Sequence, residues 1–148
     1  MTINKTNIKE IHILIVEDDN KYLNLIASML RRIGIVHISS AQNGEQALEY
    51  LDTFGDANPI DLILCDRAMP KMDGLEFLHR IRQKKSTLPF IIVTGSANEE
   101  IVLAAKSSGV TSFLSKPFTL EELKKKLAVT LQTSAGEEKP QDVDWVDL

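Results

Sequence analysis

Four short blocks of chemically active side chains are spread along this chain of 148 residues, each directly after a strand-like apolar run. The blocks are Glu17-Asp18-Asp19, Asp66, Thr94 and Lys116-Pro117. In an open parallel α/β sheet, the carboxyl ends of the strands border one crevice. We therefore expect carboxylates, a hydroxyl and an ammonium group to lie together at a single site.

Three carboxylates at one site require a counter-charge. Like charges about 4 Å apart repel by roughly 4 kcal/mol at an effective dielectric constant near 20. Mg²⁺ relieves this repulsion, because it takes hard oxygen ligands and keeps coordination positions for water and phosphate oxygens. The predicted carboxylate ligands are Asp18, Asp19 and Asp66. Lys116 adds a second positive charge, and Thr94 adds a hydroxyl donor for a phosphoryl oxygen.

A carboxylate placed between a metal ion and an ammonium group can attack a phosphoryl group and form an aspartyl phosphate. Asp66 is the predicted nucleophile, with Lys116 and the metal stabilising charge on the transferred group. An ionised carboxylate needs no general base. Alone, the pair Asp18-Asp19 is more often a solvated turn after a strand, so the prediction depends on the four blocks together.

The elements that position these residues alternate regularly. Nearly continuous apolar runs predict buried strands, and apolar residues at helical spacing predict helices between them. The predicted strands are Ile11 to Val16, Ile35 to Ser39, Ile60 to Cys65, Phe90 to Thr94 and Ser112 to Ser115. The predicted helices are Asn20 to Ile33, Gly44 to Phe54, Gly74 to Gln83, Asn98 to Ser108 and Thr119 to Leu131. This (βα)5 pattern predicts an α/β fold with a doubly wound parallel five-stranded sheet and helices on both faces.

The composition fits one globular domain, with 43% hydrophobic and 26% charged residues. We expect a folded domain over residues 11–131, an N-terminal extension over 1–10 and a flexible C-terminal tail over 132–148 that includes Trp145. The net charge of −4 gives no electrostatic reason to expect direct binding of nucleic acid or of an anionic membrane.

The cysteine usage and the hydropathy pattern favour the cytoplasm. The single cysteine, Cys65, lies inside an apolar run, so no disulfide can form within the chain and a buried structural thiol is the favoured interpretation. No apolar stretch reaches the roughly 18 residues of a membrane span, and the N-terminus lacks the apolar core of a signal peptide.

With these motifs, the chain resembles the receiver domain of two-component response regulators, in its single-domain, chemotaxis-regulator-like form, from about Ile11 to Leu131. The resemblance implies a flavodoxin-like fold with strand order 2-1-3-4-5. It also implies that a histidine kinase or a histidine phosphotransfer protein donates the phosphoryl group to Asp66. Mg²⁺ would be bound by the acidic pair, Asp66 and the backbone carbonyl of Ala68. The matching motifs are Asp18-Asp19, Asp66 followed by Met69-Pro70 and Asp73-Gly74, Thr94, Phe113, and Lys116-Pro117-Phe118.

The resemblance further implies how the signal leaves the site. Phosphorylation would draw the Thr94 hydroxyl inward, and Phe113 would rotate into the vacated space. The surface formed by residues 98–108, 112–115 and 119–131 would then bind a downstream protein. The chain is expected to be a monomer or a phosphorylation-dependent dimer.

Two other functions use the same residue types. A phosphatase of the haloacid dehalogenase type also has an aspartyl nucleophile, Mg²⁺, a hydroxyl and a lysine, but it requires a second aspartate two positions after the nucleophile, where this chain has Ala68. A receiver-like binding module that is never phosphorylated is the other alternative. Persistence of signalling in an Asp66→Ala variant would favour that alternative.

Overall fold

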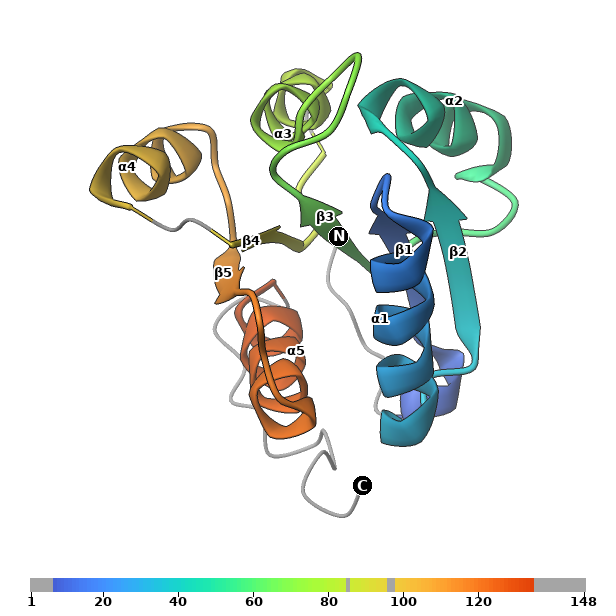
Figure 1. The fold of residues 1–148 in the computed structure, drawn as a ribbon. Helices are drawn as coiled ribbons and strands as arrows, with labels where there is room; N and C mark the ends of the chain where they lie inside the picture. The colour runs from blue at the N-terminus through green and yellow to red at the C-terminus, as the bar shows by residue number, and fades with distance from the viewer. Residues whose placement is uncertain (1–6, 85, 96–97, 135–148) are drawn as a thin grey trace.

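The computed structural model describes residues 7–84, 86–95 and 98–134, which form a parallel five-stranded sheet in the order β2-β1-β3-β4-β5 (Figure 1). The strands are β1 (His12–Val16), β2 (His37–Ala41), β3 (Leu62–Asp66), β4 (Phe90–Thr94) and β5 (Ser112–Ser115). The helices are α1 (Asn20–Ile33), α2 (Gly44–Phe54), α3 (Gly74–Gln83), α4 (Glu99–Ser107) and α5 (Leu120–Ser134). The predicted fold class and strand order are confirmed.

Two hydrophobic clusters fill the space on the two faces of the sheet. Because side chains alternate along a strand, Ile13 of β1 packs with α1 and α5, whereas Leu14 packs with α2 and α3. All residues of β1, β3 and β4 are buried, as expected of strands covered on both faces. No described helix is long and apolar enough to cross a membrane.

Four helices begin at an Asp or Asn cap close to the carboxyl ends of the strands. Each cap side chain accepts a hydrogen bond from a backbone N–H two or three residues later, which satisfies a donor that the first helical turn leaves open. The caps of α1 to α4 are Asp19, Asn43, Asp73 and Asn98. Short local hydrogen bonds therefore fix the loops that border the site.

The second strand differs from its predicted position. The sequence predicts it from Ile35 to Ser39, but β2 runs from His37 to Ala41 and pairs with β1 as an edge strand. Its side chains are mostly exposed or half-buried, because no strand covers its outer edge. The apolar residue Ile35 is buried in the connection before β2.

Ordered structure continues past both predicted ends of the domain, residues 11 and 131. A short 3₁₀ helix spans Ile8–Glu10, and Ile8 packs against the cluster on the α1 and α5 side. Helix α5 continues to Ser134, one turn beyond the predicted end. The tail prediction for residues 135–148 lies outside the described residues.

Gly74, the first residue of α3, lies against the backbone at the end of β3. A Cβ atom here would collide with the carbonyl oxygen of Asp66 and lie 3.0 Å from the Cα atom of Arg67. Backbone atoms cannot rotate aside, so we expect Gly74→Ala to lower the free energy of unfolding by about 1–3 kcal/mol. Urea unfolding measures this change. In the control Gly95→Ala, the added Cβ meets no atom within 4 Å, so similar losses in both variants would contradict the prediction.

Candidate functional site

The parallel strands bring Glu17, Asp66 and Lys116 together at their carboxyl ends. Glu17 directly follows β1, Asp66 ends β3, and Lys116 directly follows β5. The Lys116 Nζ atom lies 3.1 Å from Oε1 of Glu17 and 3.4 Å from Oδ1 of Asp66. Both carboxylates are almost fully buried. One ammonium group is thus shared between two carboxylates that come from different strands.

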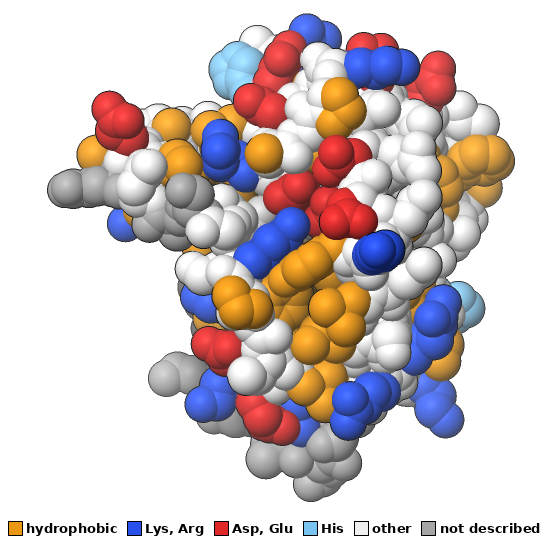
Figure 2. Space-filling view, in the orientation of Figure 1, with side chains coloured by type: hydrophobic (Ala, Val, Ile, Leu, Met, Phe, Trp, Pro, Cys, Tyr) orange, Lys and Arg blue, Asp and Glu red, His pale blue; other side chains and the backbone are white. Residues whose placement is uncertain are grey.

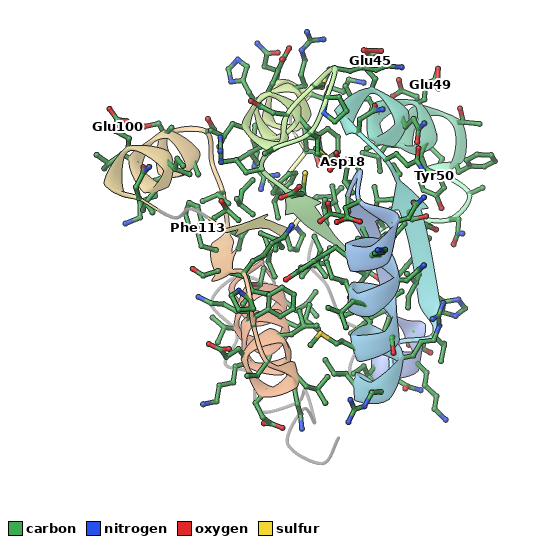
Figure 3. The ribbon with its side chains drawn as sticks, viewed as in Figure 1. Asp18, Glu45, Glu49, Tyr50, Glu100 and Phe113 are labelled. Carbon is green, nitrogen blue, oxygen red and sulfur yellow. The ribbon has the colours of Figure 1, made fainter. Side chains whose placement is uncertain are left out.

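The acidic group at this site consists of Glu17, Asp18 and Asp66. One carboxylate oxygen from each lies within 4.8 Å of the other two. Asp18 is exposed at the loop between β1 and α1 (Figure 3). Asp18 and Asp66 are ligands predicted from the sequence, whereas Glu17 is not among them.

Asp19, the remaining predicted ligand, is outside this acidic group. Its side chain accepts a hydrogen bond from the backbone N–H of Lys21 and caps α1, and its own N–H donates to Oε2 of Glu17. A local signal in the sequence indicates the capping role of Asp19. An aspartate directly before the first residue of a helix is a strong N-cap candidate.

The charges and burial of the site shift its protonation equilibria. Burial and the nearby charge of Asp66 raise the pKa of Glu17 to about 7, although the hydrogen bond from Lys116 opposes the shift. Burial alone would lower the pKa of the Lys116 ammonium, but the Glu17 hydrogen bond and the two carboxylate charges outweigh burial and raise it. Negative charge is therefore in excess at the site, and a further cation would relieve it.

The acidic group fits a magnesium ion by its donor chemistry. Its three carboxylates supply hard oxygen atoms, and a single ammonium group offsets them. Ala68 lies two residues after Asp66 in the loop that follows β3, and it is exposed. Figure 2 shows acidic side chains gathered in the centre of this face, next to a basic side chain.

Thr94 and Phe113 occupy neighbouring strands beside the site. Thr94 ends β4 and is buried, with 3% of its surface exposed. The backbone N–H of Lys116 donates to the Thr94 carbonyl, which ties the lysine loop to β4. Phe113 on β5 is half-buried and packs against the cluster on the α2 and α3 side. Figure 3 shows it at the edge of the sheet.

Two further residues complete the surroundings of the site. The Lys116 Nζ atom lies 4.0 Å from the ring centre of Tyr22, so a cation–π contact holds the ammonium from the α1 side. Tyr22 is not among the site residues predicted from the sequence. Cys65 is fully buried, and burial raises the pKa of its thiol well above the usual range, which agrees with a structural thiol.

Comparison with known proteins identifies the same motifs over most of the chain. Residues 13–128 match the family described as "Response regulator receiver domain". A chemotaxis protein CheY homolog from Campylobacter jejuni subsp. jejuni serotype O:2 (strain ATCC 700819 / NCTC 11168) is 32% identical over 127 residues, which cover 84% of this chain and 95% of that protein.

Solved structures agree in fold. A two-component response regulator from Clostridium difficile is 29% identical, has a TM-score of 0.73, and is matched over 82% of this chain and 95% of its own. The receiver domain of Francisella response regulator 1452 is 28% identical, has a TM-score of 0.74, and is matched over 83% of this chain and 98% of its own.

Proposed function

Because this chain belongs to the response regulator receiver family, we propose that it is a phosphorylation-dependent switch whose phosphoryl acceptor is Asp66. The observation that carries the proposal is the contact of Lys116 with both Asp66 and the neighbouring Glu17 at the carboxyl ends of the strands. This contact places a nucleophilic carboxylate beside a fixed positive charge. Addition of one phosphoryl group to Asp66, measured by intact-mass analysis after incubation with Mg²⁺ and acetyl phosphate, tests the proposal.

Each residue of the site has one role in the proposed transfer. The Asp66 carboxylate attacks the phosphorus atom, and the bond to the donor's leaving group breaks as the new O–P bond forms. The Lys116 ammonium, held by Glu17 and Tyr22, stays within reach of the oxygens of the incoming group. The Thr94 hydroxyl donates to another of these oxygens and so senses the modification.

Glu17, Asp18 and Asp66 would hold Mg²⁺, together with the backbone carbonyl of Ala68. The ion, when bound, would neutralise charge on the transferred phosphoryl oxygens. Asp19, also a ligand predicted from the sequence, would instead contribute by capping α1.

A histidine kinase or a histidine phosphotransfer protein would supply the phosphoryl group, as receiver domains generally accept it from such donors. The proposed readout is the face formed by α4, β5 and α5, where Phe113 would change position when Thr94 moves. Among the described side chains of α4, only that of Ala105 is buried, so this helix can shift at low cost. A downstream protein that prefers one arrangement of the face would bind there. The fully buried Cys65 is compatible with the reducing cytoplasm as the place of action.

Hydrolysis of free phosphomonoesters is less well supported. A haloacid-dehalogenase-type phosphatase requires an acid–base aspartate at the position of Ala68, and alanine cannot transfer a proton. Steady release of phosphate from p-nitrophenyl phosphate would favour this alternative over the receiver function.

Mg²⁺ affinity is expected to rise with pH through the range around neutrality. Because the pKa of Glu17 is raised to about 7, its carboxyl group is protonated below that pH and must release a proton when the metal binds. We expect the apparent affinity to increase about tenfold between pH 6 and pH 8. Isothermal titration calorimetry in buffers of different ionisation enthalpy measures both affinity and proton release.

The raised pKa of Glu17 also makes the stability of the folded protein depend on pH. A folded-state pKa above the unfolded value stabilises the metal-free protein at low pH, and this stabilisation is lost as the pH rises through about 7. Glu17→Gln should flatten both the affinity and the stability profiles in this range. Profiles that stay unchanged in Glu17→Gln would assign the titration to another group.

A further inference from the structure

An apolar strip runs between α1 and α5, directly beside the proposed phosphorylation site. Figure 2 shows it as a run of hydrophobic side chains below the acidic cluster. The strip is formed by side chains that lie on the outer side of the seam between the two helices. We define it as Tyr22, Leu25, Met29, Leu120 and Ala128.

The α1 part of the strip is a continuous stripe at helical spacing. Leu25 follows Tyr22 by three residues and precedes Met29 by four, so the three side chains lie on one side of the helix. Tyr22 marks the side that faces α5, because its ring is 6.1 Å from that of Phe118 and 4.0 Å from the Lys116 ammonium. Leu25 is 48% exposed, so this part of the stripe is open to solvent.

Basic side chains border this strip. Lys21 and Arg32 lie four residues before and seven residues after Leu25, so they are on the same side of α1, and both are exposed. On α5, Lys124 lies one turn after Leu120 and one turn before Ala128. A ligand for this surface should therefore combine apolar side chains with negative charge.

The chain itself contains a segment with this composition. Residues 142–148 read Asp-Val-Asp-Trp-Val-Asp-Leu, with apolar side chains between aspartates. The longer segment 135–148 holds five acidic residues and one lysine, so it accounts for the whole net charge of −4, and residues 1–134 sum to zero. Charge and hydrophobicity of the segment both complement the strip.

The segment can also reach the strip. Trp145 is the eleventh residue after Ser134, the last residue of α5. An extended chain of that length spans up to about 36 Å. The 15-residue helix α5 is only about 22 Å long, so the segment can return along all of it.

We propose that residues 142–148 dock in cis on the apolar strip between α1 and α5, with Trp145 against the apolar side chains and the aspartates beside the flanking basic groups. The docked segment covers the surface next to Lys116 and Tyr22. This inference does not depend on whether Asp66 is phosphorylated.

Fluorescence of the full chain tests the proposal, because Trp145 is its only tryptophan. We expect a blue-shifted emission and weaker acrylamide quenching than in a synthetic peptide of residues 135–148. High salt should partly restore the peptide-like signal, since screening weakens the charge contacts. Equal emission and quenching in the chain and the peptide would overturn the proposal.

Two matched variants locate the docking surface. Leu25→Asp places a charge in the strip at a position that is half-exposed, so folding should tolerate it. We expect the docking equilibrium to shift about tenfold toward the undocked form, which corresponds to about 1.4 kcal/mol. Leu103→Asp makes the same change on α4, where Leu103 is 58% exposed, and should leave the emission unaltered.

Two other results would overturn docking of residues 142–148 on the strip in cis. An effect of Leu103→Asp equal to that of Leu25→Asp would place the segment on another face and overturn the proposal. Emission that depends on protein concentration would show docking on a second copy instead of in cis, and would overturn the intramolecular form. Circular dichroism of both variants confirms that they are folded before the fluorescence is compared.

Discussion

Asp66→Asn is expected to abolish phosphorylation by acetyl phosphate in the presence of Mg²⁺, with a loss in rate of at least about a thousandfold. The amide is close in shape to the carboxylate but is not a nucleophile at neutral pH, so the chemistry is lost while packing is kept. Intact-mass analysis measures the result directly: the wild-type chain gains one phosphoryl group and the variant gains none. EDTA should suppress the wild-type reaction.

Asp73→Asn is the matched control for this experiment. The Asp73 side chain caps α3 by accepting a hydrogen bond of 2.9 Å from the backbone N–H of Glu76, and asparagine caps helices equally well. The variant therefore changes an aspartate near Asp66 without removing the proposed acceptor. Continued modification of Asp66→Asn, or equal loss in both variants, would refute the assignment of Asp66.

Asp18→Asn and Asp19→Asn are expected to differ strongly in Mg²⁺ affinity. Asp18 contributes a carboxylate to the acidic group, so its replacement should weaken binding by more than about tenfold, the lower limit typical even of outer-shell partners. Asp19 is used as the N-cap of α1, and asparagine can replace it there. Isothermal titration calorimetry at pH 8, where Glu17 is ionised, compares the two variants.

The comparison separates two possible ligand sets. Equal losses in both variants would favour the ligand set predicted from the sequence, in which Asp18 and Asp19 both bind the metal. If Asp19→Asn loses affinity and Asp18→Asn keeps it, Asp18 is not a ligand and both sets are contradicted. Unfolding in urea checks that neither variant has lost the cap.

The sequence predicted those parts of the fold that have a strong local signal. Helices α1, α2 and α3 have the predicted bounds because a cap residue and an apolar stripe define each of them. β2 was misplaced by two residues because an edge strand can carry polar side chains, such as Ser39 and Ser40, and so lacks the buried apolar run that marks β1.

For the site, the sequence predicted which strand ends lie together. It did not predict which side chains contact one another there. The contact between Lys116 and Glu17 joins residues 99 positions apart, and the stacking of the same ammonium on Tyr22 is equally long-range. Spacing alone could not distinguish Glu17 from Asp19, because both belong to one acidic loop. The structure shows that Asp19 caps α1 and that Glu17 contacts Lys116.

Helix α4 is only weakly packed against the rest of the domain. With one described side chain buried, this helix has little apolar surface to lose when it detaches, so its amide protons should exchange with solvent through local opening well below the global unfolding free energy. In the proposed switch, we expect the resting domain to populate the detached helix as a minor state. Phosphorylation of Asp66 would then need only a small free energy to change the ratio of the two states, and a partner would lose little of its binding energy to the rearrangement.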